Sequence, residues 1–233
     1  MVTSNTLKKI YLKGRLIMLG KIRILCYGDS NTWGYIPGSG GLRYGDDERW
    51  TKLLARKLGK NFEVIEEGLN SRTLISEDKR QGKEGRNGYK YLIPCLDTHD
   101  PIDLVVLMLG TNELKKIYNK TAEDIGKLLE IYYVKTIQER GSQVKNIPYK
   151  LLIVSPPIIN EETDFCMEGN KYSGAAKKSQ ELSGIYQDIA KRNNCYFVNG
   201  STLETGIDGV HLTRAGHKKL ADVLEKIIKE NEN

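Results

Sequence analysis

The sequence has few cysteines and no long apolar run, and each shortage excludes a class of protein. Its 233 residues include four cysteines with neither a C-x-x-C pair nor metal-ligand spacing, so we expect no disulfide framework and no bound metal. No apolar run approaches the roughly 18 residues that a membrane-spanning helix needs. We therefore expect a soluble, cytoplasmic protein with no membrane partner.

Excess charge of one sign is also scarce outside the N-terminal segment. The formal net charge is +6, but the first 17 residues hold four basic residues and no acidic one. These four are Lys8, Lys9, Lys13 and Arg15. The rest of the chain has 32 basic and 30 acidic residues, so we expect no nucleic-acid partner. We expect residues 1–17 to be a disordered extension and residues 18–233 to form a single domain.

Five short apolar runs alternate with segments of helical periodicity. The runs cover residues 22–27, 62–65, 104–109, 151–154 and 196–198. The run at 104–109, LVVLML, has no polar alternation, which is typical of a strand covered on both faces by helices. Because parallel strands connect through right-handed crossovers, the alternation predicts an α/β fold in which a five-stranded parallel sheet lies between two helical layers. Functional groups then gather beyond the carboxyl ends of the strands.

Three connecting stretches are too long and too polar or glycine-rich to be ordinary turns. They cover residues 37–47, 76–88 and 156–174. Such loops in a compact α/β domain usually shape a pocket or a subunit contact.

Polar residues follow four of the predicted strands. The segments are Gly28-Asp-Ser30, Gly68-Leu-Asn-Ser71, Gly110-Thr-Asn112 and Asp208-Gly-Val-His211. A serine hydroxyl becomes a nucleophile when a base of near-neutral pKa removes its proton, which favours histidine. Asp208, three residues before His211, has the spacing to accept the Nδ1 proton and leave Nε2 as the base for Ser30.

The other two histidines have less favourable positions. His99 precedes the third strand, at the opposite edge of the sheet from the other candidates. His217 falls in the final helix beside two lysines, so we expect it to be a solvated surface residue. The tetrahedral intermediate of acyl transfer also needs fixed donors for its oxyanion. Asn112 offers a side-chain amide, and backbone N–H groups are available at Ser30 and in the turn from Gly68 to Ser71.

Taken together, the four segments resemble the conserved blocks of the SGNH (GDSL-type) hydrolases, in order and at similar separations. The flanking strings ILCYGDSNTWGY, FEVIEEGLNSRT, DLVVLMLGTNE, VSPP and DGVHLT are similar to the arylesterase/acetyltransferase branch of that family. The resemblance covers roughly residues 20–230. It implies a three-layer α/β/α, flavodoxin-like sheet of strand order 2-1-3-4-5, and activity without a cofactor.

The resemblance also implies a role for each motif residue. Ser30 corresponds to the nucleophile, His211 to the base and Asp208 to the residue that orients it. The oxyanion donors correspond to Ser30, Ser71 and Asn112, with Ser71 preferred to Gly68. The candidates for the substrate pocket are Asn31, Trp33 and Gly68. Relatives of this branch also suggest a homo-oligomer.

Some residues depart from the family pattern or have simpler interpretations. Asn31 stands where the common motif has leucine, and Glu113 where the third block usually has aspartate. A tryptophan beside a turn or on a helix stripe more often packs in the core than lines a substrate pocket. This simpler interpretation applies to Trp33 and Trp50. We expect Asp29 to hold its turn by local hydrogen bonds. We expect Arg72 and the pair Lys79-Arg80 to be solvated or at a subunit contact.

The leading functional hypothesis is a serine esterase or acyl hydrolase acting on a small-molecule ester, with acyl transfer to alcohols or peroxide as a further outcome. A carbohydrate O-deacetylase or a lipase-like esterase is the alternative on the same scaffold. Nucleotide binding is disfavoured because residues 28–34 lack both phosphate-loop patterns. An α/β-hydrolase of the G-x-S-x-G kind is disfavoured because residue 32 is threonine. A non-catalytic module on the same fold remains an alternative, because fold alone does not determine function.

Overall fold

The computed structural model describes residues 9–12, 15–18 and 20–231. Its main sheet has five parallel strands: β3 (Ile22–Gly28), β4 (Phe62–Gly68), β5 (Leu104–Met108), β6 (Lys150–Val154) and β7 (Tyr196–Val198). The spatial order is β4-β3-β5-β6-β7, which is the expected order 2-1-3-4-5. Each of the five apolar runs is a strand, so the predicted fold class is confirmed.

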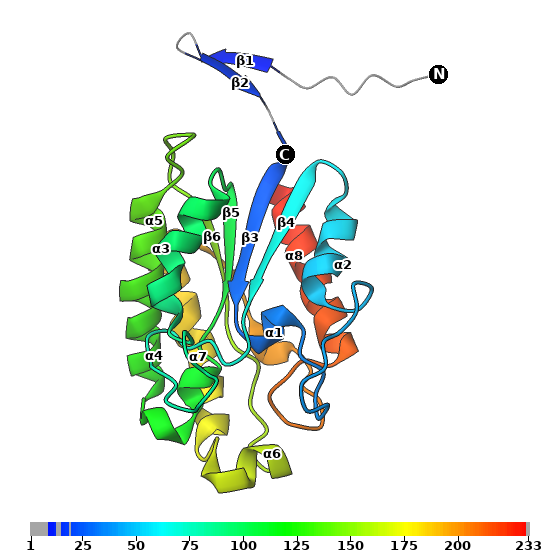
Figure 1. The fold of residues 1–233 in the computed structure, drawn as a ribbon, viewed down its shortest axis with the longest axis vertical. Helices are drawn as coiled ribbons and strands as arrows, with labels where there is room; N and C mark the ends of the chain where they lie inside the picture. Colours follow the sequence, from blue (N-terminus) through cyan, green and yellow to red (C-terminus); the bar gives the residue numbers. More distant parts are fainter. Residues whose placement is uncertain (1–8, 13–14, 19, 232–233) are drawn as a thin grey trace.

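Helices cover both faces of this sheet (Figure 1). One layer consists of α2 (Trp50–Leu58) and α8 (Arg214–Asn231). The other consists of α3 (Gly88–His99), α4 (Ala122–Leu128), α5 (Lys135–Arg140) and α7 (Ala175–Arg192). Short segments complete the fold: α1 (Ser30–Trp33), α6 (Asp164–Met167), η1 (Asn112–Leu114), η2 (Lys116–Tyr118), the π-helical η3 (Leu129–Val134), η4 (Glu168–Asn170) and η5 (Gly200–Thr202).

The central strands supply side chains to two hydrophobic cores. In β3, Ile24 and Cys26 pack with α2 and α8, whereas Leu25 and Tyr27 pack with the opposite layer. All four side chains are fully buried. Successive side chains of a strand point to opposite faces, so a strand covered on both sides needs apolar residues at every position. This accounts for the uninterrupted apolar runs in the sequence.

The helix boundaries follow local signals to different degrees. Thr121 caps α4, since its Oγ1 accepts a hydrogen bond from the Asp124 N–H at 3.1 Å and the Asp124 carboxylate accepts one from the Thr121 N–H at 3.1 Å. Thr121 and Asp124 therefore form a capping box. Helix α3 contains Pro94 in its interior. Proline weakens the helical signal because it removes one backbone donor.

A small antiparallel sheet precedes the domain in the chain. Strands β1 (Lys9–Leu12) and β2 (Arg15–Met18) pair with each other and form a sheet separate from the main one (Figure 1). We expected disorder over residues 1–17, but its described part has strand structure, consistent with the β-branched, aromatic and leucine residues there. Residues 1–8 and 13–14 lie outside the described residues. The domain start at residue 18 stays a prediction.

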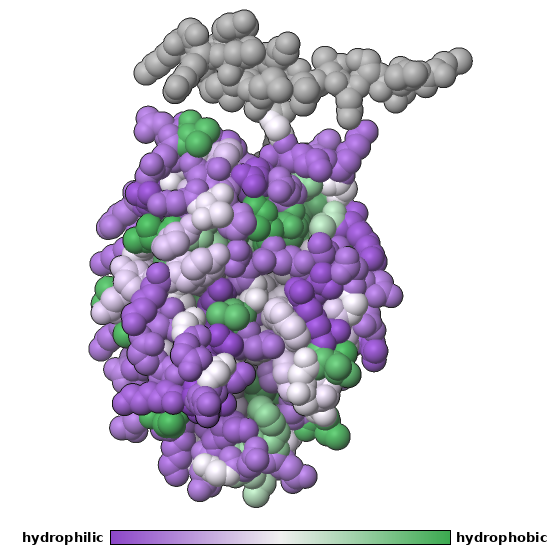
Figure 2. Space-filling model, in the orientation of Figure 1, coloured by the Kyte–Doolittle hydropathy of each residue, from purple (hydrophilic) through white to green (hydrophobic). Residues whose placement is uncertain are grey.

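The surface view shows mainly hydrophilic residues. Hydrophobic residues occur in small groups on the face drawn in Figure 2. Within the described ranges, no helix combines the length and the apolar character that crossing a bilayer requires.

Candidate active site

Helix α1 begins directly after β3 and carries Ser30 as its first residue. Two glycines allow this helix to lie on the ends of the strands. A Cβ on Gly28 would lie 2.0 Å from Thr32 Oγ1, and a Cβ on Gly68 would lie 2.2 Å from the backbone nitrogen of Trp33. Asp29 caps the helix, because its Oδ1 accepts a hydrogen bond from the Asn31 N–H at 2.9 Å. Asp29 therefore has the local role that we expected.

Ser30 meets a histidine and an aspartate from a segment distant in the sequence. His211 Nε2 lies 2.9 Å from Ser30 Oγ, and His211 Nδ1 lies 2.7 Å from Asp208 Oδ2. Ser30, Asp208 and His211 are all buried, with exposed fractions of 5%, 3% and 7%. A hydroxyl, an imidazole and a carboxylate in this order form the hydrogen-bonded chain from which a base can activate a serine.

Asp208 is held by backbone donors as well as by the imidazole. Its Oδ1 accepts hydrogen bonds from the N–H groups of Val210 at 3.0 Å and His211 at 2.9 Å, and its Oδ2 accepts one from Gly38 at 3.3 Å. Burial by itself raises the pKa of Asp208, but the hydrogen bond and charge of His211 and the backbone donors outweigh it, so the pKa lies below its ordinary value. The carboxylate is therefore ionised at neutral pH and able to accept the Nδ1 proton.

The loop that carries His211 is fixed by contacts that the sequence did not indicate. Asn31 Oδ1 accepts a hydrogen bond from the Leu212 N–H at 2.9 Å, and its Nδ2 donates to the Val210 carbonyl at 3.3 Å. The Tyr35 ring stacks on the imidazole of His211, with centroids 4.2 Å apart. Asn31 therefore holds the backbone on both sides of His211. The one signal for this role is an amide at a position where relatives have leucine.

Groups that can stabilise an oxyanion surround the same space. Asn112 is buried, and its Nδ2 donates one of its two protons to the Arg72 carbonyl at 2.9 Å. Ser71 has a φ of +65°, a conformation that glycine adopts more readily than serine. Within the described part of the chain, the backbone N–H groups of Ser30 and Ser71 donate to no acceptor. Two uncommitted N–H groups and one amide proton are thus available.

The three long loops close around these residues. They line a cavity of about 250 Å³ together with Ser30, His211, Ser71 and Asn112. The loop residues are Gly40 and Gly41, then Arg80 and Lys83, then Phe165, Lys171 and Tyr172. The prediction that these stretches shape a pocket is confirmed.

The three candidates for the substrate pocket lie elsewhere. Asn31 is directed at the His211 loop, and Gly68 lies against the backbone of α1. The Trp33 ring packs against the guanidinium of Arg43, 5.1 Å from the ring centroid. None of the three is among the residues that line this cavity, and a role for them in substrate binding stays a prediction. Trp50 is fully buried and packs in the core, as expected.

Two charged or titratable residues are buried, contrary to expectation. His217 is fully buried and its Nδ1 accepts a hydrogen bond from the Trp50 N–H at 3.3 Å. Burial, with the nearby His211, lowers the pKa of His217 to about 3. Arg72 is 2% exposed and donates to the carbonyls of Gly28 and Glu67. His217 lies three and seven residues before Leu220 and Leu224, so the apolar stripe of the helix was the signal for its burial.

A buried carboxyl lies beyond Asn112. Glu113 is fully buried, and its Oε1 accepts a hydrogen bond from the Leu74 N–H at 2.5 Å. Burial raises the pKa of Glu113 to about 8, and the neighbouring Asp29 adds to the rise. Glu113 is therefore mostly protonated at neutral pH, and it departs from the aspartate of the family pattern without adding a charge.

One group of side chains has the composition of a metal site. The ligand atoms of Glu67, Cys95 and His99 lie within 4.8 Å of one another. His99 Nε2 already lies at hydrogen-bond distance from Glu67, and burial raises the pKa of the Cys95 thiol to about 12. A thiol binds metal as its thiolate, so this cluster is better described as a hydrogen-bonded group.

Known proteins resemble this chain in sequence and in fold. Residues 26–219 match the GDSL-like lipase/acylhydrolase family. The chain is similar to the aryl esterase of M. smegmatis, with 36% sequence identity, a TM-score of 0.80, and coverage of 89% of this chain and 98% of the other. It is also similar to a carbohydrate acetylesterase from Sinorhizobium meliloti, with 34% identity, a TM-score of 0.82, and coverage of 90% and 99%. No curated protein matches the chain.

Proposed function

Because the chain belongs to the GDSL-like lipase/acylhydrolase family, we propose that it is a serine esterase that forms an acyl-enzyme on Ser30. The observation that carries this proposal is the hydrogen-bonded chain from Asp208 through His211 to Ser30, with contacts of 2.7 and 2.9 Å. No cofactor takes part in the proposed reaction.

In the acylation step, Ser30 Oγ attacks the carbonyl carbon of the ester while His211 Nε2 takes the hydroxyl proton. Asp208 stabilises the imidazolium that forms. The backbone N–H groups of Ser30 and Ser71 and the amide of Asn112 donate to the oxyanion of the tetrahedral intermediate. When the intermediate collapses, His211 returns the proton to the leaving alcohol, and the acyl group stays on Ser30.

In the second step a nucleophile enters the place of the alcohol. Water, deprotonated by His211, releases the carboxylic acid and restores the free hydroxyl of Ser30. An alcohol or a peroxide in the same place gives a new ester or a peracid. The balance depends on how strongly water is excluded, and the rings of Tyr35, Phe165 and Tyr172 border the site.

Short acyl groups suit the space beside Ser30. A cavity of about 250 Å³ lies just below the range of about 300–1,000 Å³ that is usual for ligand pockets. A series of p-nitrophenyl esters of increasing chain length tests this, and we expect kcat/KM to be greatest for acetate or propionate. A maximum at eight or more carbons would favour the lipase-like alternative.

Carbohydrate O-deacetylation is the second candidate. It is favoured by the similarity to the S. meliloti protein that is described as a carbohydrate acetylesterase. Acetate release from an acetylated sugar, compared with phenyl acetate, separates the candidates. The predicted homo-oligomer and the cytoplasmic location remain predictions.

The nucleophile is tested by covalent labelling. We expect an aryl organophosphate to add one phosphoryl group to the protein and to abolish ester hydrolysis, with the adduct mapped to Ser30 by peptide mass spectrometry. Ser30→Ala should lose both the label and at least about a thousandfold of kcat. Ser201→Ala, in the short helix η5, serves as the control. Retention of the label in Ser30→Ala would assign the chemistry to another residue.

A further inference from the structure

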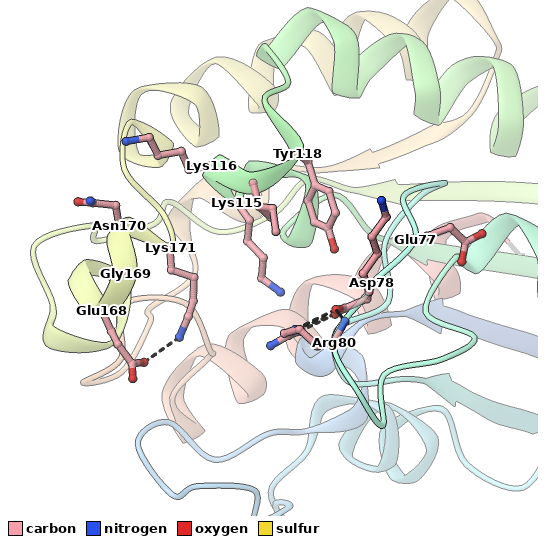
Figure 3. A pocket seen from close by; sticks show the side chains of 12 residues that line it. Glu77, Asp78, Arg80, Lys115, Lys116, Tyr118, Glu168, Gly169, Asn170 and Lys171 are labelled. Atoms are coloured by element: carbon pink, nitrogen blue, oxygen red, sulfur yellow. Dashed lines mark hydrogen bonds and ion pairs between the residues drawn. The ribbon is translucent and has the colours of Figure 1, made fainter.

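Lys115 occupies an unusual place beside the candidate active site. It follows η1, and its exposed fraction is 9%. With Arg80 and Lys171, it lines both the cavity of about 250 Å³ at Ser30 and a neighbouring cavity of about 850 Å³. Figure 3 shows the Lys115 side chain reaching into the space between Lys171 and Arg80. The two cavities therefore adjoin at this lysine, and the smaller one leads to Ser30.

The ammonium of Lys115 has no partner in the described ranges. Arg80 bonds to Asp78, with Nε 2.9 Å from Oδ1, and Lys171 Nζ lies 3.1 Å from Glu168 Oε2. Within residues 9–12, 15–18 and 20–231, the ammonium of Lys115 makes no hydrogen bond and no ion pair. The Lys115 side chain is mostly enclosed, while its ammonium faces the cavities and is open to a ligand that can supply the missing partner.

The surroundings of Lys115 keep it available to a ligand. Burial and then the charge of Arg80 lower its pKa to about 8, while Asp78 and Glu113 act in the opposite direction and Lys171 lowers it further. Lys115 is therefore mostly protonated at neutral pH. Among its described residues, the lining of the smaller cavity includes four basic side chains and no acidic one. These are Arg80, Lys83, Lys115 and Lys171. This is a local concentration of positive charge in a domain that is otherwise nearly balanced.

We propose that the substrate is an ester that also carries an anionic group, and that Lys115 binds this group while the ester carbonyl lies at Ser30. The inference rests on the proposed function and names a substrate class for it. A carboxylate, sulfonate or phosphate gives Lys115 the partner that it lacks. Arg80 and Lys171 border the same space and add positive potential, although each already has an acidic partner. A neutral ester makes no such contact.

A matched set of aryl acetates tests the proposal. The substrates are the 3- and 4-isomers of acetoxybenzoate, their neutral methyl esters, and 4-acetoxybenzenesulfonate, measured as kcat/KM of acetate release. We expect Lys115→Met to lose at least tenfold with the better acetoxybenzoate and less than twofold with its methyl ester. If Lys115→Met loses a similar factor of kcat/KM with the sulfonate, the site recognises any anion. A loss confined to the acetoxybenzoates would indicate recognition of a carboxylate. Lys116→Met is the control, because it removes the same charge from an exposed neighbour that lines the outer cavity.

The possible outcomes separate this proposal from the proposed function. An equal loss with charged and neutral esters, or no loss with either, overturns the role of Lys115 while the esterase stands. Wild-type protein that hydrolyses none of the esters overturns the proposed function itself. Inhibition of phenyl acetate hydrolysis by benzoate provides a measurement on the unaltered protein. Benzoate should inhibit competitively and at least tenfold more strongly than benzamide, and equal inhibition by both would contradict anion binding.

Discussion

At the inner end of the cavity, Asp208 accepts hydrogen bonds from the backbone N–H groups of Val210, His211 and Gly38, and Asn31 holds the backbone on either side of the imidazole. At the outer end, the ammonium of Lys115 has no acceptor in the described chain, although Lys115 as a residue is only 9% exposed. The base and its carboxylate at the inner end are thus held by protein hydrogen bonds, whereas Lys115 at the outer end has no such partner.

The difference separates two requirements. Catalytic groups must be in position before the substrate arrives, because reorganisation during the reaction raises the barrier. The hydrogen bonds of Asp208 and of the His211 loop provide that order, while the oxyanion donors are left free for the substrate. A recognition group gains most when the ligand supplies its missing partner, since the unfavourable desolvation of the charge is already present in the free protein. Removing groups from the two ends should therefore have different effects on catalysis, on substrate preference and on stability.

His211→Ala removes the base at the inner end. We expect kcat on an activated aryl ester to fall by at least about a thousandfold while the protein stays folded, because nothing else at Ser30 accepts its proton. The measurement is steady-state hydrolysis of p-nitrophenyl acetate, with circular dichroism to verify the fold. His99→Ala is the control, since its ring bonds Glu67 outside the cavity lining. A loss below tenfold for His211→Ala would show that another group acts as the base.

Asn112→Ala removes one oxyanion donor. We expect kcat to fall by about a hundredfold and KM to stay within about threefold, because the amide acts on charge that develops in the transition state. Asn70→Ala provides a matched comparison, because Asn70 also lines the cavity but has no proposed donor role. A change confined to KM would place Asn112 in ground-state binding instead.

Substitutions at the two ends should also change the stability of the protein in opposite directions. Asn31→Ala leaves the Leu212 N–H and the Val210 carbonyl unpaired, so the free energy of unfolding should fall by about 1–3 kcal/mol. Lys115→Met removes a partly desolvated cation that has no protein partner and keeps an aliphatic side chain, so stability should stay the same or rise by about 1 kcal/mol. Urea denaturation measures both. Destabilisation of similar size in the two variants would remove the distinction between the ends.

Much of the fold and of the central site follows from local sequence. The five strands were predictable because burial on both faces demands continuous apolar runs, and the parallel arrangement brings Ser30, Asn112 and His211 to one edge. The contacts of Asn31 and the burial of Arg72 were not predicted, because both side chains bond to backbone groups of other segments. Such contacts depend on how loops meet in space. The isolation of Lys115 was unpredictable for the same reason, since sequence does not show which acidic residues reach an ammonium group.

The contact between Ser30 and His211 joins residues 181 positions apart in the chain. A growing polypeptide on the ribosome therefore contains the serine long before the imidazole. Because α8 follows His211 and packs on α2, the chain through α8 must emerge and dock before these two groups are held together. Appearance of ester hydrolysis during synthesis would thus report emergence of α8, and fragments that end before His211 would be inert.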